Sequence, residues 1–192
     1  RVLVAGDRAG VAYLLLEWRP GVSAEVAAAE ARRAGRESRQ ALLNICCSIA
    51  NAYARLHAVG VVHGDVHPRN ILVDGDGAVT IIDFGYAVMP ASVEPRTARA
   101  SRGGIAFFLE PEYAQALRAG EPSPPATALG EQYAVAALLY LLVTGSHYVD
   151  FSLEPDQLLG QIAEEQPLPF AKRNTRPWPQ LEHLLLKCLS KR

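Results

Sequence analysis

A β-hairpin signal near the middle of the chain restricts the fold more than any other feature. Two short apolar segments, "NILVD" at residues 70–74 and "AVTIID" at residues 78–83, flank the turn sequence "GDG". Apolar runs on either side of such a turn are typical of two antiparallel strands. A hairpin returns the chain to its starting point, so the end of the second strand must lie beside the loop that precedes the first.

Three side chains with oxygen atoms occupy the positions that this hairpin brings together. Asp65 and Asn70 lie in the loop before the first strand, and Asp83 ends the second strand. Phosphoryl transfer requires a carboxylate that orients the attacking hydroxyl and takes its proton, together with metal ions that neutralise phosphate charge. Because Mg²⁺ takes one or two carboxylates plus phosphate oxygens, the set predicts a site for this reaction.

The aspartates of the turn also resemble a calcium-binding loop. Such a loop requires glycine at its sixth position, and counting from Asp74 that position is Val79. The spacing therefore argues against calcium and favours an ordinary turn from Asp74 to Gly77.

The remaining pattern predicts a mostly helical domain. Apolar residues recur every three or four positions between residues 36 and 58, and Gly60 follows the expected end of that helix. Ser23 is the expected N-cap of a preceding helix. Further helices are expected at residues 24–34, 111–118, 128–143, 154–165 and 179–190, and short strands at residues 2–4 and 11–17.

Composition and charge argue against several classes of function. A net charge of −1 argues against nucleic acid or an anionic membrane as a partner. The longest apolar run, residues 133–143, is about half of the ~20 residues that a membrane span needs. Three cysteines without metal-ligand spacing favour a reducing, cytoplasmic compartment. Because the chain starts at Arg1 rather than Met, we expect a piece of a longer protein.

The polar loop and the strand end together resemble a known family. "HGDVHPRN" followed by "IIDFG" is similar to the catalytic loop and the magnesium loop of the protein kinase-like family. Four further segments resemble its hinge, activation segment, central helix and a later helix: "YLLLEWRPG", "GGIAFFLEPE", "EQYAVAALLYLLVTG" and "LEHLLLKCLSKR". The resemblance implies a mainly α fold, the large lobe of a kinase. It is a helical bundle with a short β-hairpin at the catalytic loop and hinge strands at the N-terminus.

The resemblance also assigns roles to the residues of the catalytic loop. Asp65 would be the catalytic base, and Asn70 and Asp83 would hold Mg²⁺. His67 stands where the family carries a lysine that touches the γ-phosphate, and an imidazole can also donate a hydrogen bond there. His63 and Phe84 would stack in the regulatory spine of the family.

ATP is the nucleotide that the resemblance implies. Leu16 would be the gatekeeper beside the adenine, and Leu72 would form the floor under it. Glu17 and Arg19 would supply the hinge carbonyl and amide that bind the adenine edge. The implied domain boundaries are residues 1–21 for the end of the small lobe and the hinge, and residues 22–192 for the large lobe.

Besides His67, three positions depart from the family pattern. Gly64 replaces an arginine that normally binds a phosphorylated loop residue, so Ser92, Thr97 and Ser101 are not expected to be obligatory switches. Ile105 stands where serine/threonine kinases carry a threonine. Glu131 replaces an aspartate that braces the catalytic loop, which keeps the charge on a side chain one methylene longer.

The small lobe is the fourth departure. We find no Gly-rich phosphate loop, no V-A-I-K lysine and no partner glutamate. The sequence therefore predicts a large lobe whose small lobe is missing and belongs to the parent chain, and a piece that is inactive alone.

The function that follows is ATP-dependent phosphoryl transfer to a serine or threonine hydroxyl of a protein or peptide substrate. Three alternatives stay open. The H-G-D-x-H-x-x-N loop also resembles that of small-molecule phosphotransferases. The hybrid of that loop with a kinase lobe resembles the kinase-like domains of lanthionine synthetases, which act on precursor peptides. The changes at His67 and Ile105 are compatible with a pseudokinase scaffold.

Overall fold

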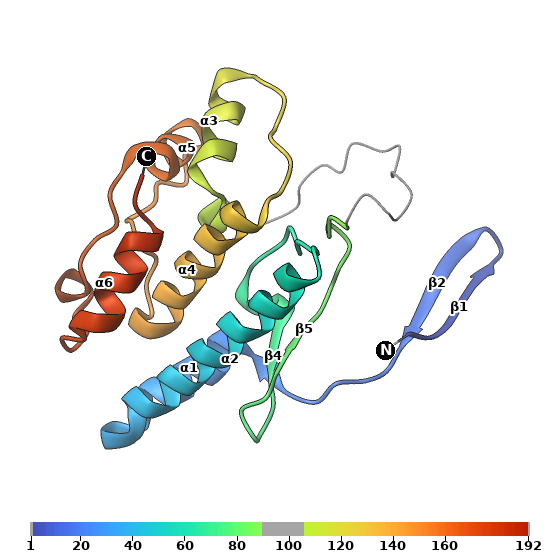
Figure 1. Cartoon of the computed structure of the whole chain (residues 1–192), viewed down its shortest axis with the longest axis horizontal. Coiled ribbons are helices and arrows are strands. Elements are labelled where there is room, and N and C mark those ends of the chain that lie inside the picture. Colours follow the sequence, from blue (N-terminus) through green and yellow to red (C-terminus); the bar gives the residue numbers. More distant parts are fainter. Residues whose placement is uncertain (1, 90–105, 192) are drawn as a thin grey trace.

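The computed structural model describes residues 2–89 and 106–191, and Figure 1 shows the arrangement of its elements. Six helices lie within these ranges: α1 (Ala24–Arg33), α2 (Ser38–Ala58), α3 (Pro111–Ala119), α4 (Ala128–Thr144), α5 (Pro155–Glu164) and α6 (Pro179–Cys188). Five strands accompany them: β1 (Val2–Arg8), β2 (Val11–Leu16), β3 (Val22–Ser23), β4 (Ile71–Val73) and β5 (Val79–Ile81). The predicted helices are therefore confirmed within a few residues at each end.

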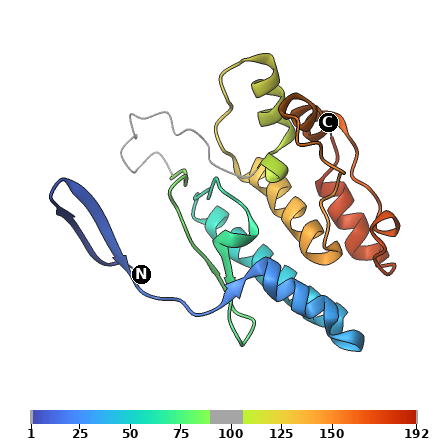
Figure 2. The same cartoon turned by 180° about the vertical axis from the view of Figure 1, so that it is seen from behind.

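Helix α4 lies at the centre of the helical body. It is apolar on every side, and 11 of its 17 residues are buried, which is typical of a helix enclosed by other elements. Figures 1 and 2 show α4 between α6 on one side and α1 with α2 on the other. The helix begins at the N-cap Thr127, whose hydroxyl accepts from the Gly130 amide at 3.0 Å, and it ends at Gly145 with φ of 77°.

Helices α1 and α2 form the second layer. Ser23 caps α1 by accepting a hydrogen bond from the Val26 amide at 3.4 Å, as the sequence predicted. Helix α2 buries one face, and a 3₁₀ turn at Gly35–Glu37 precedes it. The buried face of α2 consists of Leu42, Ile45, Cys46, Ile49, Ala52 and Tyr53.

The predicted hairpin is formed by β4 and β5, which pair antiparallel. The carboxylate of Asp74 accepts from the amides of Asp76 and Ala78 at 3.0 and 2.9 Å, so turn chemistry accounts for the aspartates of this loop. Strand β3 adds a third strand beside β4. The sequence did not predict β3, because a two-residue strand carries no periodic signal.

A second sheet at the N-terminus corrects the expected fold class. Strands β1 and β2 pair antiparallel from Val2↔Leu16 to Arg8↔Val11, around a turn in which Ala9 and Gly10 have φ of 55° and 77°. This sheet belongs to the small lobe, so the expectation of a helical fragment of the large lobe alone is wrong. The low strand propensity of Ala5 and Gly6 hid the length of β1, which cross-strand hydrogen bonds carry on to Arg8.

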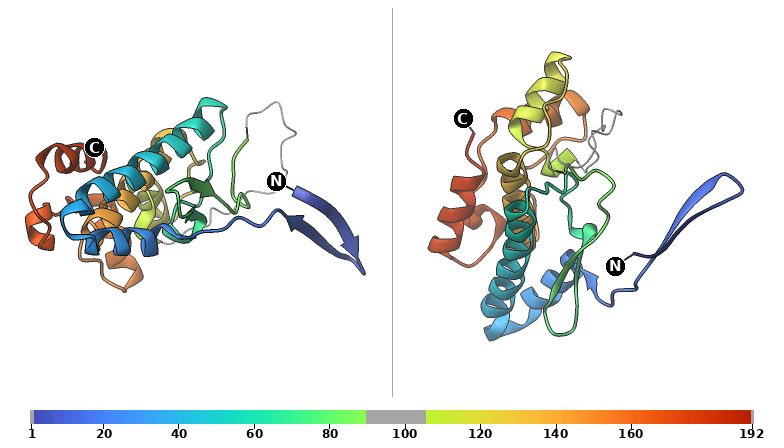
Figure 3. Two further views of the ribbon diagram at one scale, coloured as in Figure 1. Left: turned by 90° about the horizontal axis from the view of Figure 1, so that it is seen from below. Right: turned by 45° about the vertical axis from the view of Figure 1, so that its right-hand side comes forward.

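The N-terminal hairpin stands clear of the helices, joined to them by residues 17–21 (Figures 1 and 3). Four positions of the expected activation segment, Ser92, Thr97, Ser101 and Ile105, lie outside the described residues. No helix in the described part of the chain is long and apolar enough to cross a bilayer.

Candidate active site

His63 anchors the loop that carries the candidate catalytic residues. Its side chain is fully buried, and its Nε2–H donates to the Ile82 carbonyl at 2.9 Å. Its Nδ1 accepts from the Asp65 amide at 3.3 Å, so both ring nitrogens of a neutral imidazole are satisfied. The Phe84 ring packs edge-on against it with centroids 4.9 Å apart. The expected contact between His63 and Phe84 is therefore present, but as an edge-on pair, and Phe84 is 45% exposed.

Gly64 occupies a position that only glycine tolerates. Its φ is +77°, and a Cβ built there would lie 2.7 Å from the carbonyl oxygen of Tyr86. Any side chain would therefore combine a strained backbone with a clash against main chain. The arginine that the kinase-like family carries here does not fit this backbone.

Asp65 and Asn70 are in direct contact. The Asn70 amide nitrogen donates to the Asp65 carboxylate oxygen Oδ2 at 2.8 Å and to the Asp65 carbonyl at 3.0 Å. Both side chains are buried. The other carboxylate oxygen of Asp65, Oδ1, is buried without a hydrogen-bond partner. A buried, unpaired carboxylate oxygen is costly in a folded protein and calls for a functional explanation.

His67 lies beside this pair. Its Nδ1 accepts from the Arg69 amide at 3.2 Å, which leaves Nε2 as the donor of a neutral imidazole. That Nε2 lies 3.6 Å from Asp65 Oδ2, too long for a hydrogen bond but close enough for electrostatic attraction. The imidazole can therefore offer a proton to a group placed next to Asp65.

Two main-chain connections join the segment around Asp83 to the loop that carries Asp65 and Asn70. The Ile82 amide donates to the Asn70 carbonyl at 2.9 Å on one side of Asp83. On the other side, Val62 and Val88 exchange hydrogen bonds of 3.0 and 2.8 Å. Asp83 has φ of +63°, a strained conformation for a residue with a Cβ, and its side chain is exposed. These bonds hold the main chain on both sides of Asp83, and its carboxylate, which accepts from the Gly85 amide at 3.3 Å, is open to a ligand.

Glu131 connects the central helix to the catalytic loop. Its carboxylate is buried and accepts from the amides of His63 at 3.1 Å and Gly64 at 2.7 Å. His57 Nε2 lies 2.7 Å from the same group. The brace expected at Glu131 is confirmed, whereas the role of His57 was missed. Its position on the last turn of α2 carried no sequence signal for a partner 74 residues away.

The residues expected to hold adenine are less closely gathered. Leu72 lies on β4, paired with Ser23. Leu16 is 57% exposed at the end of β2, in the hairpin that stands clear of β4. Glu17 and Arg19 form an exposed ion pair with each other at 3.1 Å. These four assignments stay predictions.

The oxygen donors present fit a magnesium ion. Within residues 2–89 and 106–191, no three His, Cys, Asp or Glu side chains gather closely enough to hold a metal by themselves. Asn70 and Asp83 would supply one amide and one carboxylate oxygen, and Mg²⁺ usually completes its shell with water and substrate phosphates. Because Asn70 gives its amide protons to Asp65, its oxygen is the atom left for a cation.

Comparison with known proteins agrees with this geometry. A family model described as "Protein kinase domain" matches residues 7–192. The chain is similar to a probable serine/threonine-protein kinase, CE0033, of Corynebacterium efficiens, at 32% identity over 72% of this chain and 20% of the relative. It is 30% identical to serine/threonine-protein kinase PrkC of Bacillus subtilis, over 97% of this chain and 27% of the relative. PknB of Mycolicibacterium smegmatis is 28% identical over 93% of this chain and 27% of the relative.

These matches bear on two questions: whether small-lobe sequence is present, and how much of its relatives the chain covers. It begins inside β1, which supports the correction that small-lobe sequence is present in this chain, so the expectation of a missing small lobe gains no support. The chain spans about a quarter of the length of the curated relatives it matches. These relatives give no support to the small-molecule, lanthionine synthetase or scaffold alternatives.

Proposed function

Since the chain belongs to the protein kinase domain family, we propose that the protein containing it transfers the γ-phosphoryl group of ATP to a serine or threonine hydroxyl of a protein substrate. The observation that carries this proposal is the Asp65 carboxylate. One of its oxygens is held by Asn70, and the other is buried without a partner. That unpaired oxygen is the acceptor that an incoming hydroxyl needs.

The proposed reaction follows from these positions. The substrate hydroxyl donates its hydrogen bond to Asp65 Oδ1, which orients the oxygen toward the γ-phosphorus. A new O–P bond forms as the bond to the β-phosphate oxygen breaks, and Asp65 takes the hydroxyl proton. Mg²⁺, bound by Asn70 and Asp83, would neutralise the phosphate charge. His67 would donate its Nε2–H to a γ-phosphate oxygen.

We propose that the protein lies in the cytoplasm, because the three cysteines of this chain are free, as is usual in a reducing compartment. We also propose that residues 1–192 alone do not transfer phosphate from ATP. Every lysine of the chain lies at residue 172 or later, so the N-terminal hairpin offers no ammonium group to the phosphates.

The test is phosphoryl transfer from labelled ATP to a serine- and threonine-containing peptide mixture by the longest protein that contains this chain. Asp65→Asn is expected to lower the rate by about 10²–10⁴-fold, the usual contribution of a general base. Asp76→Asn, which changes an exposed aspartate of the β4–β5 turn, is the matched control and should leave the rate unchanged. Equal rates for Asp65→Asn and the control would refute the proposed role.

A further inference from the structure

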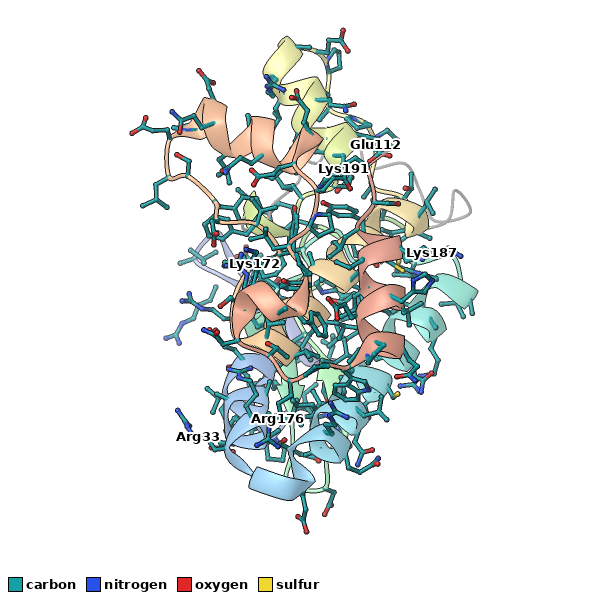
Figure 4. The ribbon with its side chains drawn as sticks, turned by 90° about the vertical axis from the view of Figure 1, so that its left-hand side faces the viewer. Arg33, Glu112, Lys172, Arg176, Lys187 and Lys191 are labelled. Atoms are coloured by element: carbon teal, nitrogen blue, oxygen red, sulfur yellow. The ribbon has the colours of Figure 1, made fainter. Side chains whose placement is uncertain are left out.

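A groove lined by arginines lies far from the candidate active site. It is enclosed by the end of α1, the start of α2, the end of α4 and residues 173–178, and its volume is about 580 Å³. Its cationic side chains are Arg32, Arg33, Arg39, Arg173 and Arg176. None of the described residues that line it is an aspartate or a glutamate. Figure 4 shows Arg33 and Arg176 on the same face of the molecule.

This concentration of positive charge contrasts with the rest of the chain. The whole sequence has 19 lysines and arginines against 20 acidic residues. With the five groove arginines set aside, 14 basic residues remain against 20 acidic ones. An extended polyanion such as nucleic acid would meet net negative charge outside the groove, whereas a short anionic segment would not.

Arg173 has unused hydrogen-bonding capacity. Its side chain is 10% exposed, and its Nη1 donates to the exposed Asp150 carboxylate at 2.5 Å. Its Nε and Nη2 are buried without a partner at hydrogen-bond distance, and the Tyr140 hydroxyl also interacts with this guanidinium. A guanidinium matches the geometry of an oxyanion, and the charge of Arg173, only partly balanced by Asp150, favours an anion in the groove.

Arg32 lies beside a second arginine whose positive charge is only partly compensated. Its Nη1 donates to the Leu142 carbonyl, and burial together with the neighbouring Arg33 lowers its pKa. Glu25 only partly opposes this effect. An anion in the groove would relieve the repulsion between the two arginines.

An apolar wall makes the groove suited to a peptide. Trp178, Leu42 and Val143 line it beside the arginines. The Arg39 guanidinium lies over the Trp178 ring, 5.4 Å from its centroid, and donates to the Pro177 carbonyl. Aromatic and arginine side chains together are typical of sites that anchor another polypeptide.

We propose that this groove binds an acidic segment of a polypeptide, with its carboxylates on the arginines and an apolar side chain against Trp178. This inference rests on the proposed function: the acidic segment is a docking sequence of the protein substrate. Thr144 in the groove lies thirteen positions along α4 from Glu131, which braces the catalytic loop, or about 20 Å away. At least about six extended residues therefore separate the docking segment from the phosphorylated hydroxyl.

The test is direct binding of a fluorescent peptide of about ten residues, long enough to cross the groove, composed of glutamate, aspartate and one central leucine. Fluorescence anisotropy compares the unaltered protein with the pair Arg33→Gln and Arg176→Gln. The control pair is Arg55→Gln and Lys187→Gln, both exposed and outside the groove. Arg33 and Arg55 each lie in the last turn of a helix, so helix-dipole effects are matched.

The groove pair is expected to weaken binding by about tenfold, and the control pair by much less. Binding should also weaken as salt is raised. An equal loss of peptide affinity in both pairs of variants would show that only the net charge of the protein matters, and it would overturn the proposal. Tighter binding to vesicles containing phosphatidylserine than to the peptide would also overturn it, in favour of a membrane surface.

Two further measurements separate this inference from the proposed function. Asp65→Asn should lower turnover by about 10²–10⁴-fold and leave peptide binding intact. The protein that carries Arg33→Gln and Arg176→Gln should still phosphorylate a short peptide that lacks an acidic segment. Loss of turnover on that short peptide would place these arginines in the structure of the active site and contradict a docking role.

Discussion

At the scale of single residues, Gly64 shows how structure changes the meaning of a substitution. From sequence it was interpreted as the loss of a regulatory arginine. The structure adds a steric reason, because the left-handed backbone and the Tyr86 carbonyl leave no space for a Cβ. The regulatory interpretation stays a prediction, since the activation segment lies outside the described residues.

Gly64→Ala is expected to lower the free energy of unfolding by about 1–3 kcal/mol and to reduce phosphoryl transfer. Gly77→Ala is a matched control, because Gly77 has φ of +78° and open space around its Cβ position. Urea denaturation should show a larger loss for Gly64→Ala than for the control. Equal losses would mean that backbone strain alone, without the clash, determines the cost.

His147 predicts a pH dependence of stability. It lies among the rings of Phe107, Phe108 and Phe151, and burial lowers its pKa below 6.5. His147 therefore binds a proton more tightly in the unfolded chain than in the folded protein. The contribution of the neutral His147 ring to folding stability is complete above pH 6.5, and it is lost as the pH falls through the pKa of His147 in the folded protein.

The melting temperature of the unaltered protein should therefore fall more steeply as the pH drops below 6.5 than that of His147→Phe, which keeps an aromatic ring. His183→Phe, at an exposed position, is the control and should keep the slope of the unaltered protein. A slope that His147→Phe leaves unchanged would contradict the assignment.

At the scale of elements, the first turn of α4 positions the catalytic loop. The Thr127 cap sets where the helix begins, and Glu131 then faces the amides of His63 and Gly64. His57, on the last turn of α2, meets the same carboxylate. Three segments distant in sequence are joined at one buried charge.

Glu131→Gln is expected to cost about 1–3 kcal/mol of stability, because an amide NH₂ would face one of these donors. Phosphoryl transfer should fall more than ATP affinity does, since the loop that carries Asp65 loses its support. Glu121→Gln, at an exposed residue after α3, is the control for thermal melts and kinetics. A rate unchanged in Glu131→Gln would show that His63 packing alone holds the loop.

At the scale of the whole molecule, the chain has a firm helical body and a peripheral sheet. Helix α4 is enclosed by its neighbours, whereas β1 and β2 expose most of their side chains and, among the described strands, pair only with each other. A two-stranded hairpin alone is marginally stable in water. Cooperative stability should therefore be highest in α4 and lowest in the N-terminal sheet.

Hydrogen exchange measured by mass spectrometry tests this ranking. Peptides from α4 should exchange slowest, and peptides covering residues 2–16 should exchange fastest among the regular elements. The β4–β5 hairpin is the internal control, because it has the same strand pairing but packs against the helical body. Slow exchange in both hairpins would show that β1 and β2 have a partner in solution.

The sequence by itself determined the local elements and the chemistry of the loop. Periodicity, caps and turn residues specify α1, α2, α4 and the β4–β5 hairpin, because these signals depend on neighbours within a few positions. The hairpin then brings Asp65 and Asn70 near Asp83 by connectivity alone. Tertiary structure decided what depends on contacts between distant segments: the unpaired oxygen of Asp65, the steric requirement at Gly64, the His57–Glu131 pair, the third strand β3 and the arginine groove. No local pattern encodes such contacts, because the packing of whole elements brings the partners together.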